Sequence, residues 1–296
     1  CNTGCCNRDF RLFKKMTDIQ NFSYHSHTNF SDGNNSLEEM VAKAKKIGFK
    51  ELGISDHLIV HKNMAQSLSW PYWHQRGKYN IFNNNFKSVL SDYQRHCEKI
   101  RKLSERENFK LYVGFEVDFF TYDGWLEELK DFLSKLDYDY LISGNHMLFD
   151  EKCENLFDIT DLPVLYPDKS LQKDLLQRHF NTIKMAVESG VFKFLAHLDY
   201  ARKIGEKFCA KDDYKIEKIS ILNALQKQNM PMEISSKGLR KIGDFYPCDW
   251  ILTEAAKRNI SFVISDDAHS VVELGDSFGL AEATLAAHKI KNRLKF

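Results

Sequence analysis

Several features are scarce in this sequence of 296 residues, and each scarcity argues against a class of partner or structure. No apolar run approaches the ~20 residues that a membrane-spanning helix needs, so no membrane partner is expected. Charge of one sign is not in excess, because 42 lysines and arginines face 41 aspartates and glutamates, and the net charge is +1. A chain with so little net charge has no global attraction to nucleic acid, which is therefore not expected as a partner.

Cysteines are too scattered for a disulfide framework. Their number, seven, is odd, and four of them stand isolated: Cys97, Cys153, Cys209 and Cys248. We expect these four to be buried or half-buried thiols in a reducing compartment, which predicts a cytoplasmic protein. The other three lie at the start: Cys1, Cys5 and Cys6. We expect residues 1–18 to be a poorly ordered extension, and the start of a processed lipoprotein is the alternative.

The rest of the chain, residues 19–296, alternates between strand-like and helix-like patterns without a low-complexity linker, which predicts a single α/β domain with a parallel sheet. Seven strands are expected, at 19–24, 50–55, 110–115, 138–144, 191–196, 232–235 and 261–265. Helices are expected between most of them. The first runs over 36–47, where Ser36 and Glu39 have the spacing of a capping box.

Two segments, residues 58–85 and 149–167, break this rhythm and are expected to be loop insertions. The first is rich in aromatic residues, namely Trp70, Tyr72 and Trp73 beside Pro71. A long aromatic loop in a compact domain is often functional, so it is expected to form a lid or pocket wall. A packed surface excursion is the alternative.

Polar side chains with metal-binding capacity follow six of the seven expected strands. His25 and His27, two residues apart, point to the same face of a strand, which makes half of a metal site. In parallel α/β folds the site gathers at the carboxyl ends of the strands. An open sheet would place ligands at one or two switch points. Ligands on nearly every strand therefore predict a closed or nearly closed barrel.

The complete candidate set has nine members: His25, His27, Asp32, His57, Glu116, His146, His197, Asp267 and His269. Any one of these histidines alone would be read as an ordinary hydrogen-bonded side chain. Zinc takes about four ligands, so nine suffice for two or three divalent ions if Glu116 bridges a pair. Imidazole and carboxylate donors without a thiolate suit Zn, Mn or Fe.

At these positions the sequence resembles the polymerase and histidinol phosphatase (PHP) superfamily. The matching motifs are, in order, 25–28 (HSHT), 31–33 (SDG), 55–57 (SDH), 114–118 (GFEVD), 144–146 (GNH), 197–199 (HLD) and 265–269 (SDDAH). They cover most of the chain. Residues 236–241 (SKGLRK) and 197–203 (HLDYARK) look like the substrate segments of the histidinol-phosphate phosphatase branch.

The resemblance implies a distorted, TIM-like (β/α)7 barrel that holds a trinuclear site. By the family pattern, one ion would be held by His25, His27, Glu116 and Asp267. A second would be held by Glu116, His146 and His197, and a third by Asp32, His57 and His269. Members of the family often have a histidine where this chain has Asp32.

The activity expected from this pattern is hydrolysis of the phosphate monoester L-histidinol phosphate. Divalent ions create hydroxide at pH 7, and a hydroxide that bridges two of them would attack phosphorus. Glu116 and Asp267 are predicted to be catalytic. So are Arg202 and Arg240, whose paired donors suit phosphate. Two further residues are predicted to bind substrate, Ser236 and Asp118, although Asp118 has orientation of a histidine as its alternative role.

Three other functions are carried as alternatives. A PHP-type phosphoesterase could act on a nucleotide or another small phosphate ester. A non-catalytic metal-binding relative would be expected to lack ligands, whereas none of the nine positions is apolar. An amidohydrolase-like barrel shares the His-x-His motif and the aspartate of the last strand, but the lysine that bridges two ions in such sites has no counterpart at a strand end here.

Overall fold

The computed structural model describes residues 19–69 and 82–296. Nine strands form its main sheet, and seven of them are parallel neighbours in the spatial order β1-β2-β5-β6-β9-β10-β11. Their bounds are Phe22–Ser23 (β1), Glu51–Ile54 (β2), Lys110–Val117 (β5), Tyr140–Ser143 (β6), Phe194–Leu195 (β9), Met232–Ser235 (β10) and Phe262–Ser265 (β11). Each lies within or overlaps one of the seven strands expected from the sequence.

The first and last strands of this order come together, so the sheet is a nearly closed barrel. Just beyond the two strands, Ser26 bridges to Ala268, and the amide of His27 donates to the Ala268 carbonyl at 2.8 Å. Nearer the amino-terminal end of the barrel, the side-chain amide of Gln20 forms hydrogen bonds of the kind that a neighbouring strand would form. It donates to the carbonyl of Ile264 at 2.6 Å and accepts from the amide of the same residue at 3.2 Å. The prediction of a distorted seven-stranded barrel is confirmed.

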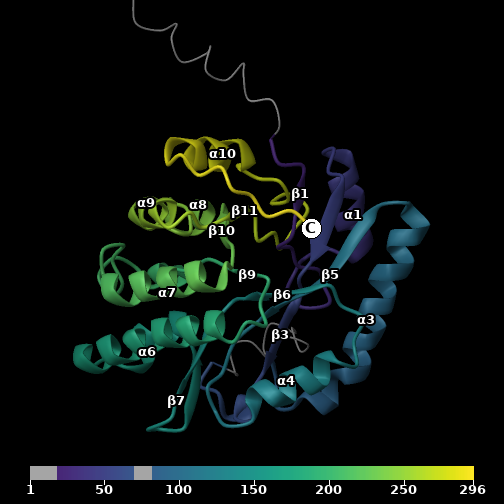
Figure 1. Ribbon diagram of the computed structural model, residues 1–296. Coiled ribbons are helices and arrows are strands. Elements are labelled where there is room, and N and C mark those ends of the chain that lie inside the picture. The colour runs from purple at the N-terminus through teal and green to yellow at the C-terminus, as the bar shows by residue number, and fades with distance from the viewer. Residues whose placement is uncertain (1–18, 70–81) are drawn as a thin grey trace, which may run out of the picture.

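Helices surround this barrel on the outside (Figure 1). The longer ones are α1 (Leu37–Lys46), α3 (Phe86–Glu107), α4 (Trp125–Leu133), α6 (Lys169–Glu188), α7 (Lys215–Gln228), α9 (Asp249–Lys257) and α10 (Phe278–Ala287). Helix α1 begins with the predicted capping box, in which Ser36 and Glu39 satisfy each other's backbone amides. A short helix that was not predicted, α8 (Lys237–Ile242), follows β10 directly.

The amino-terminal end of the barrel interior holds a cluster that we call the aromatic plug. It comprises Phe22, Tyr24, Tyr112, Tyr140, Ile142, Phe194, Val263, Leu294 and Phe296. Tyr140 fits there because its neighbours on β2 and β5 are glycines: a Cβ added to Gly53 or Gly114 would lie 2.2 Å from it. Its hydroxyl donates to the Tyr24 carbonyl at 2.7 Å, and Phe296 stacks on the Tyr24 ring at 4.1 Å. In Figure 1 the C-terminus accordingly lies among the strands.

The two predicted insertions contain regular structure. Strand β3 (His57–Val60) begins just before the first insertion and pairs in parallel with β5 and with β4 (Phe82–Asn83). The second, expected to be irregular, instead contains most of an antiparallel hairpin of β7 (Met147–Asp150) and β8 (Asn155–Asp158), followed by the short helix α5 (Leu162–Leu165). The predicted lid residues 70–73 and the extension 1–18, with Cys1, Cys5 and Cys6, lie outside the described residues.

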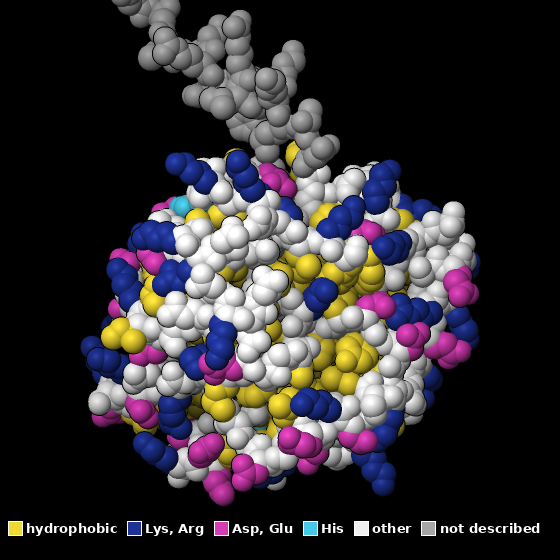
Figure 2. Space-filling view, in the orientation of Figure 1, with side chains coloured by type: hydrophobic (Ala, Val, Ile, Leu, Met, Phe, Trp, Pro, Cys, Tyr) yellow, Lys and Arg dark blue, Asp and Glu magenta, His cyan; other side chains and the backbone are white. Residues whose placement is uncertain are grey.

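The face shown in Figure 2 carries charged side chains of both signs. Figure 2 shows lysine and arginine side chains interspersed with aspartate and glutamate over the visible face. Of the isolated cysteines, three are buried as expected, whereas Cys153 is exposed in the turn between β7 and β8. Among the helices of residues 19–69 and 82–296, none combines the length and the apolar character needed to cross a bilayer.

Candidate metal centre

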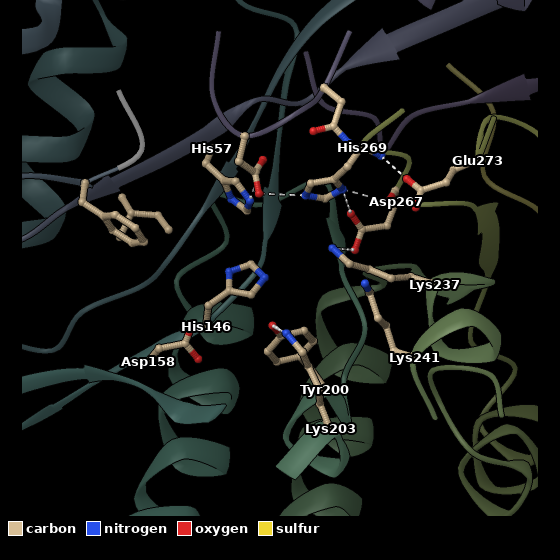
Figure 3. Close-up of a pocket in the computed structure, with 14 residues that line it drawn as sticks. His57, His146, Asp158, Tyr200, Lys203, Lys237, Lys241, Asp267, His269 and Glu273 are labelled. Carbon is tan, nitrogen blue, oxygen red and sulfur yellow. Dashed lines mark hydrogen bonds and ion pairs between the residues drawn. The ribbon is translucent and has the colours of Figure 1, made fainter. Parts of the chain in front are cut away.

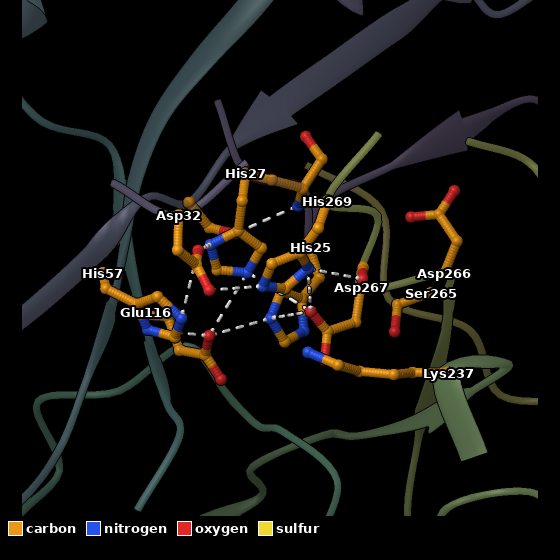
Figure 4. A network of polar contacts seen from close by, with 12 residues as sticks. His25, His27, Asp32, His57, Glu116, Lys237, Ser265, Asp266, Asp267 and His269 are labelled. Atoms are coloured by element: carbon orange, nitrogen blue, oxygen red, sulfur yellow. Dashed lines mark hydrogen bonds and ion pairs between the residues drawn. The ribbon is translucent and has the colours of Figure 1, made fainter. Parts of the chain in front are cut away.

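The nine ligand-type side chains converge at the carboxyl end of the barrel, and Figure 4 labels seven of them, all but His146 and His197. They come from the segment after β1, the start of β3, the end of β5, and the segments after β6, β9 and β11. Seven are buried, and only Asp32 and His269 are partly exposed. Successive side chains of a strand alternate between faces, so Glu116 points into the barrel on the same side of β5 as Tyr112 of the plug.

Glu116 lies at the centre of this arrangement and is fully buried. Its Oε2 lies 3.2 Å from Nε2 of His25 and 3.2 Å from Nδ1 of His57, while its Oε1 lies 2.8 Å from Nε2 of His197. The absence of a side chain at Gly144 makes this approach possible, because a Cβ there would lie 2.7 Å from Glu116 Oε1. One carboxylate thus faces imidazoles from several strands with each of its two oxygens.

Three overlapping groups have the compactness of a metal site, with ligand atoms within 4.8 Å of one another. They are His25, His27, Glu116 and Asp267; His57, Glu116 and His146; and His27, Asp32, His57 and His269. The first is the predicted set for one ion. In the second, His57 stands where His197 was predicted, although His197 contacts Glu116. The third consists of the predicted set Asp32, His57 and His269 together with His27. All nine candidates are therefore brought together.

The hydrogen bonding of these groups fits divalent cations. Within the described part of the chain, no hydrogen-bond partner is present for His25 Nε2, either ring nitrogen of His27, Glu116 Oε2 or Asp267 Oδ1. A buried polar group left unpaired costs about 1–3 kcal/mol, and more if it is charged. Several such atoms aimed at one another would all be satisfied by bound cations, so this donor set suits divalent metal ions.

The pKa values of the cluster also fit a site for cations. Burial by itself raises the pKa of Glu116, but attraction to the imidazoles of His25, His146 and His57 outweighs it and holds that pKa well below its usual range. Burial lowers the pKa of His27, but the carboxylates of Asp267 and Glu116, each 3.3 Å from its Nε2, raise it to about 9. Without a metal ion, protons on imidazoles thus balance the carboxylates. Metal binding must displace such protons, so metal affinity is expected to rise with pH.

Two carboxylates outside the nine candidates, those of Glu233 and Asp118, orient imidazoles of the cluster. Glu233 of β10 lies with Oε2 2.9 Å from Nδ1 of His25, and its Oε1 accepts from the amide of His197 at 2.7 Å. Asp118 lies 2.9 Å from Nδ1 of His146 and also accepts from the Met147 amide at 2.6 Å. Both oxygens of Asp118 are thus engaged by the protein. This geometry favours orientation of a histidine over a contact with a substrate amine.

A cavity of about 310 Å³ opens above the ligands (Figure 3). Five of the nine candidates line it, namely Asp32, His57, His146, Asp267 and His269. Three lysines, Lys203, Lys237 and Lys241, line it as well. Lys237 is closest to the ligands, with Nζ 2.8 Å from Oδ2 of Asp267. The cavity therefore combines a metal-ligating floor with a cationic wall.

Arg202, predicted to hold phosphate, is buried and bonded to the protein. Its guanidinium donates to Asp199 Oδ2 at 3.1 Å, to the Phe245 carbonyl at 3.1 Å and to Asp244 Oδ2 at 2.6 Å. Arg202 is not one of the described residues that line the cavity. Its contact with phosphate stays a prediction.

Arg240 is similarly engaged. It donates to the Asp266 carbonyl at 2.6 Å, to Asp276 Oδ2 at 3.2 Å and to the hydroxyl of Ser236 at 3.3 Å. Within the described part of the chain, neither Arg240 nor Ser236 belongs to the cavity lining. Their substrate contacts also stay predictions. In this conformation Arg240 connects α8 to the segment after β11.

Glu233 and the three lysines of the cavity wall were not among the predicted site residues. A signal for Glu233 was present, because it is a charged residue between apolar neighbours in the strand Met232–Ser235. Such a residue is rarely buried without a partner. Lys237 had a weaker signal, its position two residues past the end of a strand. Its role depends on the direction of a long side chain, which a spacing pattern does not encode.

The geometry can be compared with known proteins. A family model described as "PHP domain" matches residues 23–237, more than half of the chain. The chain belongs to the PHP family. This finding confirms the resemblance of the strand-end motifs.

Two relatives of this PHP protein are histidinol-phosphatases by name. A "Probable histidinol-phosphatase" of Deinococcus radiodurans is 28% identical over 167 residues, which are 56% of this chain and 60% of that protein. A "Histidinol-phosphatase" of Bacillus subtilis is 22% identical over 272 residues, 86% of this chain and 95% of that protein. The chain thus spans less than two thirds of the first relative and nearly all of the second.

A solved structure shows the same fold. The histidinol phosphate phosphatase of Lactococcus lactis, described as complexed with zinc, L-histidinol and phosphate, superposes with a TM-score of 0.62 at 18% identity. The alignment covers 93% of this chain and 96% of that one. At this identity the likeness establishes the barrel fold alone.

Proposed function

We propose that this PHP protein is a metal-dependent phosphatase that hydrolyses L-histidinol phosphate to L-histidinol and phosphate. The observation that carries the proposal is the placement of nine ligand-type side chains at one barrel end, beneath a cavity with a cationic wall. The names of two relatives support the substrate. So does the description of the Lactococcus lactis structure with L-histidinol and phosphate.

The residues that would hold the metal are those of the three compact groups together with His197. Bound Zn, Mn or Fe would activate a water molecule near neutral pH and offset the negative charge on the phosphoryl oxygens. Glu116 and Asp267 fix the imidazoles through their contacts and supply negative charge. Glu233 and Asp118 hold His25 and His146 in the orientation in which their Nε2 atoms face Glu116. The side chains are therefore arranged in advance of substrate binding.

Release of inorganic phosphate tests the proposal. Purified protein with its metals counted is assayed against L-histidinol phosphate, a 3′,5′-bisphosphonucleotide and simple alkyl phosphates at equal concentration. We expect kcat/KM to be highest for L-histidinol phosphate, and we expect a chelator to abolish turnover. Equal, slow rates across the panel would reject the substrate, and selective hydrolysis of the nucleotide would assign the activity to that class instead.

A further inference from the structure

The cationic wall of the cavity is formed by two short helices that follow neighbouring strands. Lys203 lies in the 3₁₀ helix Tyr200–Ile204 after β9, and Lys237 and Lys241 lie on α8 after β10. The two lysines of α8 are four residues apart and share a face of that helix. Figure 3 shows the amino groups of all three directed toward the cavity.

Lys237 is the most constrained of the three. Its side chain is only 12% exposed, and its Nζ is anchored 2.8 Å from Oδ2 of the fully buried Asp267. An ammonium group has three donors, and a single contact with Asp267 leaves donors for a ligand in the cavity.

Lys241 is an exposed member of the wall. No described residue forms a hydrogen bond or ion pair with its amino group, although it lines the same cavity as Lys203 and Lys237. Like charges that share a cavity repel one another, and the repulsion is relieved when an anion binds between them. The amino group of Lys203 donates to the Tyr200 hydroxyl at 2.8 Å, and the carboxylate of Asp158, which lines the same cavity, attracts it.

In the conformation seen, Arg202 and Arg240 do not contribute to the cationic wall of the cavity. The donors of Arg202 and Arg240 that form hydrogen bonds are directed to acceptors of the protein, and the described cavity lining includes neither residue. The Nε atom of each arginine has no hydrogen-bond partner among the described residues, but it is buried. The lysines, by contrast, already face the space above the metal ligands.

We propose that Lys237, Lys241 and Lys203 form the phosphate-binding wall of the site, with Lys237 fixed by Asp267 so that phosphate lies directly over the metal ligands. This inference rests on the proposed phosphatase function for its biological meaning. Its physical content is narrower, because it states which side chains bind the phosphoryl oxygens. The two arginines then act as positioning residues that hold α8 and the 3₁₀ helix in place.

The test is binding of inorganic phosphate to the metal-loaded protein, measured by titration calorimetry, with the metal content of each sample counted. The variants are Lys237→Gln, Lys241→Gln and Lys203→Gln. The matched control is Lys102→Gln, at an exposed lysine of α3. Because a hydrogen bond to a charged group is strong, we expect Lys237→Gln to weaken phosphate binding about tenfold or more, and Lys241→Gln and Lys203→Gln to weaken it less. The control should bind as the parent does.

Two results would overturn the wall. One is unchanged phosphate affinity in Lys241→Gln, which removes an exposed side chain and is expected to fold. The other is a Lys237→Gln protein that loses metal but binds phosphate normally per loaded site, which would restrict Lys237 to holding Asp267. Turnover of L-histidinol phosphate is measured in parallel. If the parent turns it over while lysine changes leave phosphate binding intact, the wall fails alone. If lysine-dependent phosphate binding occurs without turnover, the proposed substrate fails alone.

Discussion

The two ends of the barrel interior are built in opposite ways. At the amino-terminal end, aromatic rings fill the space, and the hydroxyls of Tyr24 and Tyr140 are hydrogen-bonded within the protein. At the carboxyl end, the described residues leave buried atoms of His25, His27 and Glu116 without hydrogen-bond partners. The first end stabilises the fold by burial, and the second opposes folding unless cations bind.

The same strands contribute to both ends. Strand β5 places Tyr112 in the aromatic plug and Glu116 in the metal centre, four residues further along. A rigid, well-packed base below allows strained, charged side chains above to be held in fixed positions. The difference shows that the residues that stabilise the fold and the residues suited to bind metal lie at opposite ends of the barrel. Substitutions at each end can test this separation.

The largest effect is expected for Glu116→Gln, compared with Glu51→Gln, a buried glutamate at the plug end that accepts from the Tyr24 hydroxyl. Loss of Glu116 removes the carboxylate shared by the imidazoles. Metal content should fall, and kcat/KM should fall about a thousandfold or more, since metal ions supply several kcal/mol of transition-state stabilisation. Glu51→Gln should leave activity unchanged and cost about 1 kcal/mol of unfolding free energy. Equal loss of metal in both variants would refute the separation.

A smaller effect is expected for the same substitution made at each end, Gly144→Ala and Gly114→Ala. A Cβ at residue 144 would lie 2.6 Å from Cε1 of His146, so that ligand must move. Displacement of a reacting group by about 1 Å can cost about a hundredfold in activity. A Cβ at residue 114 meets the Tyr140 ring instead, which should lower stability by about 1–3 kcal/mol while metal content per folded chain is retained. Metal counting and denaturant unfolding would distinguish the two, and a reversed pattern would contradict the comparison.

The smallest effect is expected for Glu233→Gln, which keeps the shape of the side chain but removes the charge behind His25 and His197. Residues that orient metal ligands typically contribute ten- to a hundredfold to metal affinity, so we expect a loss in that range. Competition with a coloured chelator measures it. Glu127→Gln, at an exposed position of α4, is the control. Unchanged affinity in Glu233→Gln would show that the imidazoles are positioned by packing alone.

Much of the fold could be predicted because its signals are local. The helix expected over 36–47 is α1, and Ser36 with Glu39 predicted its start. The hairpin of β7 and β8 could not be predicted, because its strands are four residues long and lack a clean alternation. A strand that short is stabilised by its pairing partner rather than by its own pattern.

For the site, the order of residues along the chain determined that histidines and carboxylates follow nearly every strand, and parallel strands carry such residues to one end. Only the closed barrel decided which of them meet: Glu116 lies between imidazoles brought from separate strands by sheet register. The tertiary structure likewise turned Lys237 toward Asp267 and Arg202 toward Asp199 and Asp244. Local periodicity specifies the face of a strand or helix, whereas the direction of a long side chain depends on charges that arrive from distant parts of the chain.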